Sequence, residues 1–420
     1  MYSFAIFLYM CAIGIAAIFN KRARKLAVGH RNAFFQLKQQ VQKDARYIWF
    51  HAASLGEFEQ GRPLMERLRR EHPEFKILLT FFSPSGYEVR KNWEGADVIC
   101  YLPLDTPGAV RLFFHYVKPE MLFLIKYEFW QNYLKSCRRL GIPVYSVSSI
   151  FRPNQIFFRW YGRGYAKVLD KVTHFFVQNQ QSADLLASLG HTDNVTIVGD
   201  TRFDRVLDIR SAARPLPLVE KFAANHTVFV AGSSWPPDEA LFIPWFLEKN
   251  NTEGEGIENS TNHSPRLIIA PHLIGDDHLR DIESHLQGRR VLRYSAANEE
   301  NVTEAEVLII DCFGLLSSIY RYGQLAMVGG GFGAGIHNVP EAAVYGIPVL
   351  IGPNNQNFRE ARHLLDVGAC FEVHNASDFT QIADHLLGDA EAYRHASEAS
   401  RHYIADNAGA TDIIYRHVFA

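Results

Sequence analysis

Short apolar runs alternate with longer amphipathic runs along most of the chain. The apolar runs of the first half lie at 47–54, 76–83, 98–102, 121–127, 143–149, 174–178 and 195–198. Amphipathic stretches with helical spacing lie between them, at 58–71, 109–117, 129–140 and 182–189. Strands that alternate with helices at this spacing predict a parallel, doubly wound sheet. The strands are almost continuously apolar, which predicts that helices cover both faces of the sheet.

A break at 211–218, which contains Pro215 and Pro217, separates this series from a second one and favours a linker. Apolar runs then resume at 227–231, 266–270, 290–294, 307–310, 326–329 and 349–351. We therefore predict an α/β fold with two Rossmann-like domains, at 21–210 and 219–400, and a C-terminal helix at 401–420 that is able to pack back on the first domain. Ligands of such domains bind at the carboxyl ends of the strands, so we expect the domains to face a central cleft.

The amino terminus has a different character. Residues 2–19 form an uncharged, almost wholly apolar run of about the length that spans a bilayer, and Lys21, Arg22, Arg24 and Lys25 follow it. Positive charge after the span predicts a cytoplasmic body. The alternative is a cleaved signal peptide, which needs basic residues before the apolar run and a small-residue cleavage site after it. The sequence favours a retained membrane anchor over 1–20.

Composition excludes several classes of function. The net charge of -2 and the lack of a basic-aromatic pattern argue against a nucleic-acid partner. The five cysteines are scattered without metal-ligand spacing, which predicts a reducing compartment and no metal site. We expect no cofactor.

A glycine-rich segment at 329–343 is the most informative motif. Glycines such as Gly330 and Gly331 allow backbone amides to approach an anion, and a following helix offers its positive end to a phosphate. Glu341 lies one turn into that predicted helix, where a carboxylate can accept hydrogen bonds from ribose hydroxyls. The alternative is a glycine-rich turn without a ligand. Asn357 and Glu360, after the next strand, favour a nucleotide-sugar site.

Glu57 is the candidate general base. It follows the first strand, at the start of a helix whose positive end stabilises the ionised carboxylate that a base needs. The alternative is an ordinary first-turn glutamate. Glu59 competes with it, but it lies two residues further on and should point elsewhere.

Other polar groups also follow strands. Glu128 faces the predicted cleft or caps a helix, and Arg202 binds an anionic donor group or pairs with Asp204. Gly232, Ser233 and Ser234 hold a phosphate or form a capped turn. His272 ends a further strand, where a lone histidine is more often structural.

Four segments resemble the 3-deoxy-D-manno-octulosonic acid (Kdo) transferases of Gram-negative bacteria. The family's H-x-x-S-x-G-E loop matches His51, Ser54, Gly56 and Glu57, and its E-x-W region resembles Glu128 and Trp130. Its G-N-L-K-F-D segment is similar to residues 199–204, with Arg202 in place of lysine. The most specific block, H-N-x-x-E followed by G-x-P-V-L-x-G-P and N-F, matches His337, Asn338, Glu341, Gly346, Pro348, Val349, Leu350, Gly352, Pro353, Asn357 and Phe358.

The resemblance implies a membrane-anchored, inverting, metal-independent glycosyltransferase of the GT-B architecture. The donor would be CMP-Kdo, the acceptor a lipid A precursor of the lipid IVA type, and the pathway lipopolysaccharide core biosynthesis at the cytoplasmic side of the inner membrane. Glu57 would be the catalytic base. The expected substrate-binding residues are Ser54, Gly56, Glu128, Arg202, Gly232, Ser233, Ser234, His272, Gly330, Gly331, His337, Asn338, Glu341, Asn357 and Glu360.

Two segments depart from the family pattern. G-S-T-H-E becomes the sequence at 232–236, and P-R-H-P-E-R becomes that at 270–275, so an arginine expected near the donor is missing while His272 still aligns. Two alternatives stay open: a different membrane-associated GT-B enzyme that uses a UDP-sugar, and a non-enzymatic nucleotide-binding module.

Overall fold

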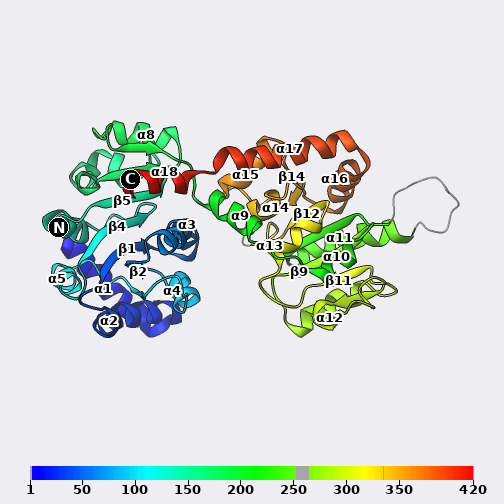
Figure 1. The fold of residues 1–420 in the computed structure, drawn as a ribbon, viewed down its shortest axis with the longest axis horizontal. Helices are drawn as coiled ribbons and strands as arrows, with labels where there is room; N and C mark the ends of the chain where they lie inside the picture. Colours follow the sequence, from blue (N-terminus) through cyan, green and yellow to red (C-terminus); the bar gives the residue numbers. More distant parts are fainter. Residues whose placement is uncertain (1, 252–263, 334, 420) are drawn as a thin grey trace. The chain divides into compact units, whose positions relative to one another are not determined.

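A computed structural model describes residues 2–251, 264–333 and 335–419. Contacts divide the chain into two units, Met1–Arg205 with Ala408–Ala420, and Val206–Asn407 (Figure 1). The domain limits drawn from the sequence stay predictions. The helices do not follow those limits, since α10 (Pro217–Ala223) begins inside the predicted linker and α17 (Ala390–Asn407) runs past residue 400.

Unit 1 contains a seven-stranded sheet in the order β3-β2-β1-β4-β5-β6-β7, and every neighbouring pair is parallel. Its strands are β1 (Arg46–Ala52), β2 (Phe75–Phe81), β3 (Val98–Tyr101), β4 (Pro119–Ile125), β5 (Val144–Ser149), β6 (His174–Val177) and β7 (Val195–Ile197). Its longer helices are α1 (Tyr2–Phe19), α2 (Lys21–Gln40), α3 (Leu55–Glu71), α4 (Pro84–Arg90), α5 (Pro107–Tyr116), α6 (Gln131–Leu140), α8 (Gln180–Ala187) and α18 (Ala410–Phe419), and α9 (Arg202–Ser211) crosses into unit 2.

Alternate residues of β1 enter two apolar cores, one on each face of the sheet. Trp49 packs in one core with Phe113 of α5, and Phe50 packs in the other with Phe58 of α3. Helices therefore cover both faces, as the apolar strands predicted (Figure 1). This arrangement leaves the carboxyl ends of the strands to position polar side chains.

Helices α1 and α2 form a hairpin at the start of unit 1. Helix α1 is long and apolar enough to cross a membrane, as judged by length and composition alone. Asn20 caps α2 by accepting hydrogen bonds from the amides of Arg22 and Ala23, at 2.8 and 3.2 Å. Arg24 reaches back to α1 and donates to the carbonyl oxygens of Ala17 and Ile18, both at 3.0 Å.

The start of α1 also contacts the body of unit 1. The hydroxyl of Tyr2 donates to Asp105 Oδ2 at 2.6 Å, and the Tyr2 ring stacks on Tyr165. Asp105 additionally accepts hydrogen bonds from the backbone amides of Asn132 and Tyr133 at the start of α6. Both ends of α1 are thus bonded to other parts of the same unit.

Unit 2 contains a second parallel seven-stranded sheet, in the order β10-β11-β9-β8-β12-β13-β14. Its strands are β8 (Val228–Ser234), β9 (Arg266–Pro271), β10 (Val291–Arg293), β11 (Val307–Ile309), β12 (Leu325–Val328), β13 (Val349–Ile351) and β14 (Cys370–Glu372). Besides α10 and α17, its helices include α11 (Pro236–Asn251), α12 (Asp276–His285), α13 (Leu316–Ile319), α14 (Pro340–Ala343), α15 (Arg359–Asp366) and α16 (Ala376–Gly388).

The tail is two helices. Helix α17 ends at Asn407, Gly409 adopts a φ of 98°, and α18 packs Ala410 and Ile414 into a core of unit 1. Asp204 accepts hydrogen bonds from the amides of Gly409 at 2.5 Å and Thr411 at 2.6 Å, which caps the start of α18. The carboxylate of Asp204 thus has a structural role at α18, and Arg202 pairs with Asp200 instead.

Candidate functional site

Polar side chains gather in unit 1 at the carboxyl ends of the neighbouring strands β1 and β4. His51, which is fully buried in β1, directs Nδ1 towards Thr80, with 2.9 Å to Oγ1 and 3.1 Å to the carbonyl oxygen. Its Nε2 lies 3.6 Å from Glu128 Oε2 and has no hydrogen-bond partner among the described residues. His51 thus presents one ring nitrogen to the carboxylate that follows β4.

Glu57 is the third residue of α3 and is 8% exposed. Its Oε2 accepts a hydrogen bond from the backbone amide of Ala53 at 2.5 Å. Burial raises the pKa of Glu57, and the charge of Glu128 raises it further, whereas the Ala53 amide and the charge of Lys126 lower it. Desolvation is the largest effect, so it outweighs the stabilisation of the ionised carboxylate that was expected from the helix end. A carboxylate with a raised pKa is a stronger base once it is ionised.

Glu128 lies between the end of β4 and α6. Its Oε2 accepts a hydrogen bond from the indole N–H of Trp130 at 3.1 Å, and the Trp130 ring stacks on Phe82 with centroids 4.9 Å apart. The alternative role of Glu128 as a helix-capping acid is wrong, because Asp105 accepts the first amides of α6. Sequence reasoning missed Lys126, which adopts a φ of 66° two residues earlier and acts electrostatically on Glu57.

Ser54 and Gly56 form the open end of α3. Ser54 is the N-cap residue, but its hydroxyl makes no capping hydrogen bond. A methyl group built on Gly56 would have no heavy atom of the described residues within 4 Å beyond its chain neighbours, so these residues leave space beside the start of the helix. Glu59 points elsewhere, as predicted, and pairs with Arg90 at 2.8 Å. The cluster of unit 1 therefore combines a buried acid, a second acid and an accessible helix end.

Arg202 lies at the other end of the same sheet edge, after β7. Its guanidinium donates to Asp200 Oδ2 at 2.9 and 3.1 Å, and Gln60 donates to the same carboxylate. Although burial favours the neutral acid, the Arg202 charge holds the pKa of Asp200 below its usual value. The side chain of Arg202 is 37% exposed, so it is still reachable from solvent.

The glycine-rich loop of unit 2 begins where β12 ends and is held by Asp238 of α11. Asp238 is 1% exposed, and its Oδ2 accepts hydrogen bonds from the amides of Gly330 at 3.0 Å and Trp235 at 2.9 Å. Burial raises the pKa of this carboxyl group, and the two amides partly offset the effect. Sequence reasoning missed Asp238, whose only local signal is an acid in the first turn of a helix.

Glycine is required at several positions of this loop, including the two predicted site residues Gly330 and Gly331. Gly330 has a φ of 94°, which side chains disfavour, and a Cβ on Gly331 would lie 2.6 Å from Gly352. Both residues are buried, and their lack of a side chain allows the loop to pack against Gly352, the residue that follows β13. Gly333 is exposed and has space for a Cβ, whose nearest neighbour is the carbonyl oxygen of Gly330 at 3.8 Å.

Three rings stack beside the glycine-rich loop. The exposed ring of His272 stacks on Trp235 with centroids 4.5 Å apart and on His337 at 4.6 Å. Trp235 Nε1 donates to His337 Nε2 at 3.4 Å. Burial lowers the pKa of His337, as does the neighbouring His272. The predicted residues His272 and His337 are thus brought together by Trp235, which occupies one of the positions that depart from the family pattern.

The end of β8 lies next to this stack and is tightly packed. A Cβ on Gly232 would overlap the Tyr320 hydroxyl, and Ser233 adopts a φ of 53°. Ser234 is buried, and its hydroxyl donates to Glu239 Oε1 at 2.9 Å. That hydroxyl is used inside the unit, which leaves the half-buried Ser233 as the accessible hydroxyl of this turn.

Asn338 and Glu341 are paired with each other, since Asn338 Nδ2 donates to Glu341 Oε1 at 2.7 Å. The helix predicted to start at Asn338 is a single turn, α14, and its N-cap residue is Val339. A four-residue helix has only a small dipole, so the phosphate site expected at its start depends mainly on the backbone amides of the loop and stays a prediction. Asn357 is exposed, and Glu360 lies in the first turn of α15.

The predicted residues therefore form separate groups within their units. His51, Ser54, Gly56, Glu57 and Glu128 surround the start of α3. The residues of unit 2 that surround the ring stack are Gly232, Ser233, Ser234, His272, Gly330, Gly331 and His337. Across residues 2–251, 264–333 and 335–419, no three or more His, Cys, Asp or Glu side chains are grouped so as to hold a metal ion.

Comparison with known proteins relates this chain to one family. Residues 27–205 match the family described as 3-deoxy-D-manno-octulosonic-acid transferase (kdotransferase). A 3-deoxy-D-manno-octulosonic acid transferase of Aquifex aeolicus (strain VF5) is 28% identical over 346 residues, which cover 81% of this chain and 86% of that protein. The transferase of the same name from Bordetella pertussis is 27% identical over 378 residues, covering 87% of this chain and 85% of that one.

A solved structure supports the architecture. The UDP-GlcNAc 2-epimerase of Neisseria meningitidis, bound to UDP-GlcNAc, superposes with a TM-score of 0.59 at 14% identity and covers 88% of this chain and 98% of its own. A likeness at this identity concerns the fold alone. It confirms the predicted α/β architecture of the GT-B type.

Proposed function

Because this chain belongs to the 3-deoxy-D-manno-octulosonic acid (Kdo) transferase family and is a glycosyltransferase, we propose that it moves Kdo from CMP-Kdo to a lipid A precursor of the lipid IVA type. This reaction would belong to lipopolysaccharide core biosynthesis. The observation that carries the proposal is the buried Glu57 carboxyl group with Glu128 beside it, at a sheet edge inside the segment that matches the family.

In the proposed mechanism, Glu57 acts as the general base of an inverting transfer. Ionised Glu57 takes the proton of an acceptor hydroxyl, and the acceptor oxygen bonds to the anomeric carbon of Kdo. The bond between that carbon and the phosphate oxygen of CMP breaks on the opposite face, and CMP leaves with the bonding electrons. The raised pKa of Glu57 supports this role because general bases work best when their pKa approaches the working pH.

Unit 2 would bind the donor. Backbone amides of the loop after β12 would stabilise the leaving phosphate electrostatically, so the proposal assigns no step to a metal ion. The ring stack of Trp235, His272 and His337 offers a flat surface for the cytosine base or the sugar carboxylate. The Asn338–Glu341 pair supplies polar groups for the ribose, with Asn357 and Glu360 nearby in sequence. Arg202 stays a candidate for an anionic group of the substrate.

Helix α1 would anchor the protein at the inner membrane, with the body on the cytoplasmic side. The hydroxyl of Tyr2 bonds Asp105 of the body, and Arg24 bonds the last carbonyls of α1. A helix whose two ends are bonded to one compact unit favours a monotopic arrangement, in which it lies in the interface, over a full span. The basic residues that follow would face anionic headgroups, each contributing about 1 kcal/mol.

One incubation tests the proposal. Purified full-length protein is mixed with CMP-Kdo and lipid IVA, and the lipid product is weighed by mass spectrometry. We expect a product heavier by one or more Kdo units, together with free CMP. A parallel reaction contains UDP-GlcNAc as the sole donor. Transfer from UDP-GlcNAc but not from CMP-Kdo would contradict the proposal.

A further inference from the structure

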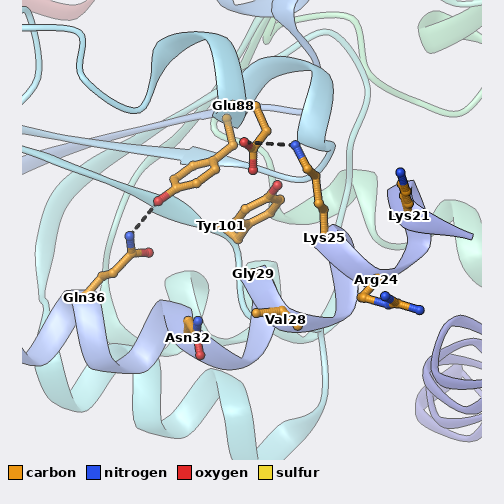
Figure 2. Close-up of a pocket in the computed structure, with 10 residues that line it drawn as sticks. Lys21, Arg24, Lys25, Val28, Gly29, Asn32, Gln36, Glu88 and Tyr101 are labelled. Carbon is orange, nitrogen blue, oxygen red and sulfur yellow. Dashed lines mark hydrogen bonds and ion pairs between the residues drawn. The ribbon is translucent and has the colours of Figure 1, made fainter. Parts of the chain in front are cut away.

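A cavity of about 480 Å³ opens in unit 1 between α2 on one side and α4 with the end of β3 on the other (Figure 2). None of the residues assigned to catalysis or donor binding lines it. Lys21, Arg24 and Lys25 line it from the first turns of α2, and Tyr87, Glu88 and Tyr101 line it from the opposite wall. It is therefore a separate hollow with basic groups on one side and aromatic groups on the other.

Tyr101 forms the floor of this cavity and depends on a glycine in α2. A Cβ on Gly29 would overlap the Tyr101 ring, so only glycine allows the ring to lie under the helix. Glycine inside a helix is unfavourable, and its presence here has this packing reason. Tyr101 is 2% exposed, yet its hydroxyl has no hydrogen-bond partner among the described residues. A buried hydroxyl without a partner is costly, which indicates a ligand that would accept its hydrogen bond.

The three basic side chains have different partners. Arg24 is engaged with the carbonyls of α1, whereas Lys21 forms no ion pair with any residue that the structure describes. Lys25 Nζ lies 3.2 Å from Glu88 Oε2 across the mouth (Figure 2). Glu88 also lies 3.7 Å from Lys91, so it keeps a partner if Lys25 turns away. The ammonium groups of Lys21 and Lys25 are thus available to bind an anion. The one carboxylate beside them, Glu88, would still be paired with Lys91.

We propose that this cavity binds the phosphate group of a membrane lipid. The ammonium groups of Lys21 and Lys25 hold the phosphate, the Tyr101 hydroxyl donates to one of its oxygens, and Tyr87 and Val28 contact the apolar part. Lys21 follows the apolar helix α1 after a single residue, so the mouth lies near the depth of lipid headgroups if α1 is in the interface. The phosphate comes either from a membrane phospholipid or from a phosphorylated glycolipid acceptor, and the second source rests on the proposed function.

The binding of dihexanoyl phosphatidic acid to full-length protein in detergent tests the proposal, for example by titration calorimetry. Tyr101→Phe removes only the unpartnered hydroxyl, so we expect the midpoint of thermal unfolding to stay the same or rise while affinity falls about tenfold. Lys25→Ala should weaken binding by a similar factor. Inorganic phosphate should compete, and dihexanoyl glycerol, which lacks phosphate, should neither bind nor compete.

Lys38→Ala is the matched control, because Lys38 is an exposed lysine of α2 that does not line the cavity. The Lys38→Ala protein should bind dihexanoyl phosphatidic acid as tightly as the unchanged protein does. If Lys38→Ala lowers affinity as much as Lys25→Ala, or if Tyr101→Phe binds as tightly as the unchanged protein, the cavity is not a phosphate site.

Transfer kinetics distinguish the two sources. A raised KM for lipid IVA in Tyr101→Phe, with kcat unchanged, assigns the phosphate to the acceptor. An unchanged KM together with weaker phosphatidic acid binding assigns it to a membrane phospholipid. The binding measurement needs neither donor nor turnover, so a failure of the proposed transferase reaction would leave this test intact.

Discussion

The Nε2 atom of His51 lies 3.6 Å from the Oε2 atom of Glu128, and a fully buried histidine is thereby directed at a carboxylate that itself raises the pKa of Glu57. The side chains of β1, α3 and the β4 end are therefore electrostatically coupled. Removal of the charge of Glu128 should therefore lower the pKa of Glu57 even if the Glu57 side chain does not move.

Glu57→Gln removes the proposed proton acceptor while preserving shape. General-base catalysis contributes about 10²- to 10⁴-fold, so we expect kcat to fall by that factor while CMP affinity stays nearly the same. Product formation by mass spectrometry and CMP titration check the two expectations. Glu59→Gln is the control, because Glu59 lies on the same helix as Glu57 but is paired with Arg90 of α4. Near-normal turnover in Glu57→Gln would refute the assignment.

Glu128→Gln should move the pH dependence of the reaction. The charge of Glu128 raises the pKa of Glu57, so its removal lowers that pKa and keeps the base ionised in more acidic solution. The acidic limb of the profile of kcat/KM against pH is then expected at lower pH than in the unchanged protein. A limb that stays in place would show that Glu57 does not govern it.

The same pKa shift predicts how stability depends on pH. A carboxyl group whose pKa is raised in the folded state stabilises the fold below its unfolded pKa, and this contribution is lost as pH rises through the folded pKa. Glu57→Gln lacks this titration. Its urea midpoint should therefore exceed that of the unchanged protein at pH 8, and the advantage should shrink towards pH 4. If the urea midpoints of the two proteins differ by the same amount at pH 4 and at pH 8, folding does not raise the pKa of Glu57.

Asp238→Ala should destabilise unit 2. The amides of Gly330 and Trp235 lose their acceptor in a buried place, and each loss costs about 1–3 kcal/mol. Chemical denaturation should show a decrease of about 2–4 kcal/mol in the free energy of unfolding. Asp277→Ala, on the exposed side of α12, provides a comparison with almost no expected effect. CMP affinity should fall only in Asp238→Ala, since the loop after β12 loses its support.

Two alanine substitutions test whether the glycine-rich loop depends on close packing at a particular glycine or only on its glycine content. Gly331→Ala places a Cβ 2.6 Å from Gly352, so the loop must move away from the β13 end and CMP binding should weaken at least tenfold. For Gly333→Ala, the nearest described atom beyond the chain neighbours is the carbonyl oxygen of Gly330 at 3.8 Å, so this variant should fold normally. Circular dichroism melts and CMP titration of the two proteins check this contrast. Equal behaviour would mean that the loop contacts are not needed.

The alternation of apolar runs was sufficient to predict both sheets, because parallel strands are buried on both faces. The run at 98–102 became β3, and that at 307–310 became β11. Strand β14, Cys370–Glu372, was missed because Gly368 and Glu372 interrupt its apolar run. The break at Gly409 was also missed, since its stabilising acid, Asp204, lies 205 positions earlier in the chain.

The candidate site was predictable where it is local and not where it depends on neighbouring strands. Glu57 at a helix start follows from its own segment. The Asp238–Gly330 bond and the Trp235–His337 contact join residues 92 and 102 positions apart, and only the pairing of β8 with β12 makes them neighbours. The raised pKa of Glu57 was not predicted, because burial is a property of the folded unit.

Arg24 gives the helical hairpin a property that its hydropathy does not reveal. The final carbonyl groups of a helix normally require water, which would keep the end of α1 out of any dry layer. The guanidinium of Arg24 meets that requirement from within the chain, at the carbonyls of Ala17 and Ile18. Arg24 therefore replaces water at these two carbonyls, so this end of α1 is able to lie deeper in the headgroup layer than a helix end whose carbonyls depend on water.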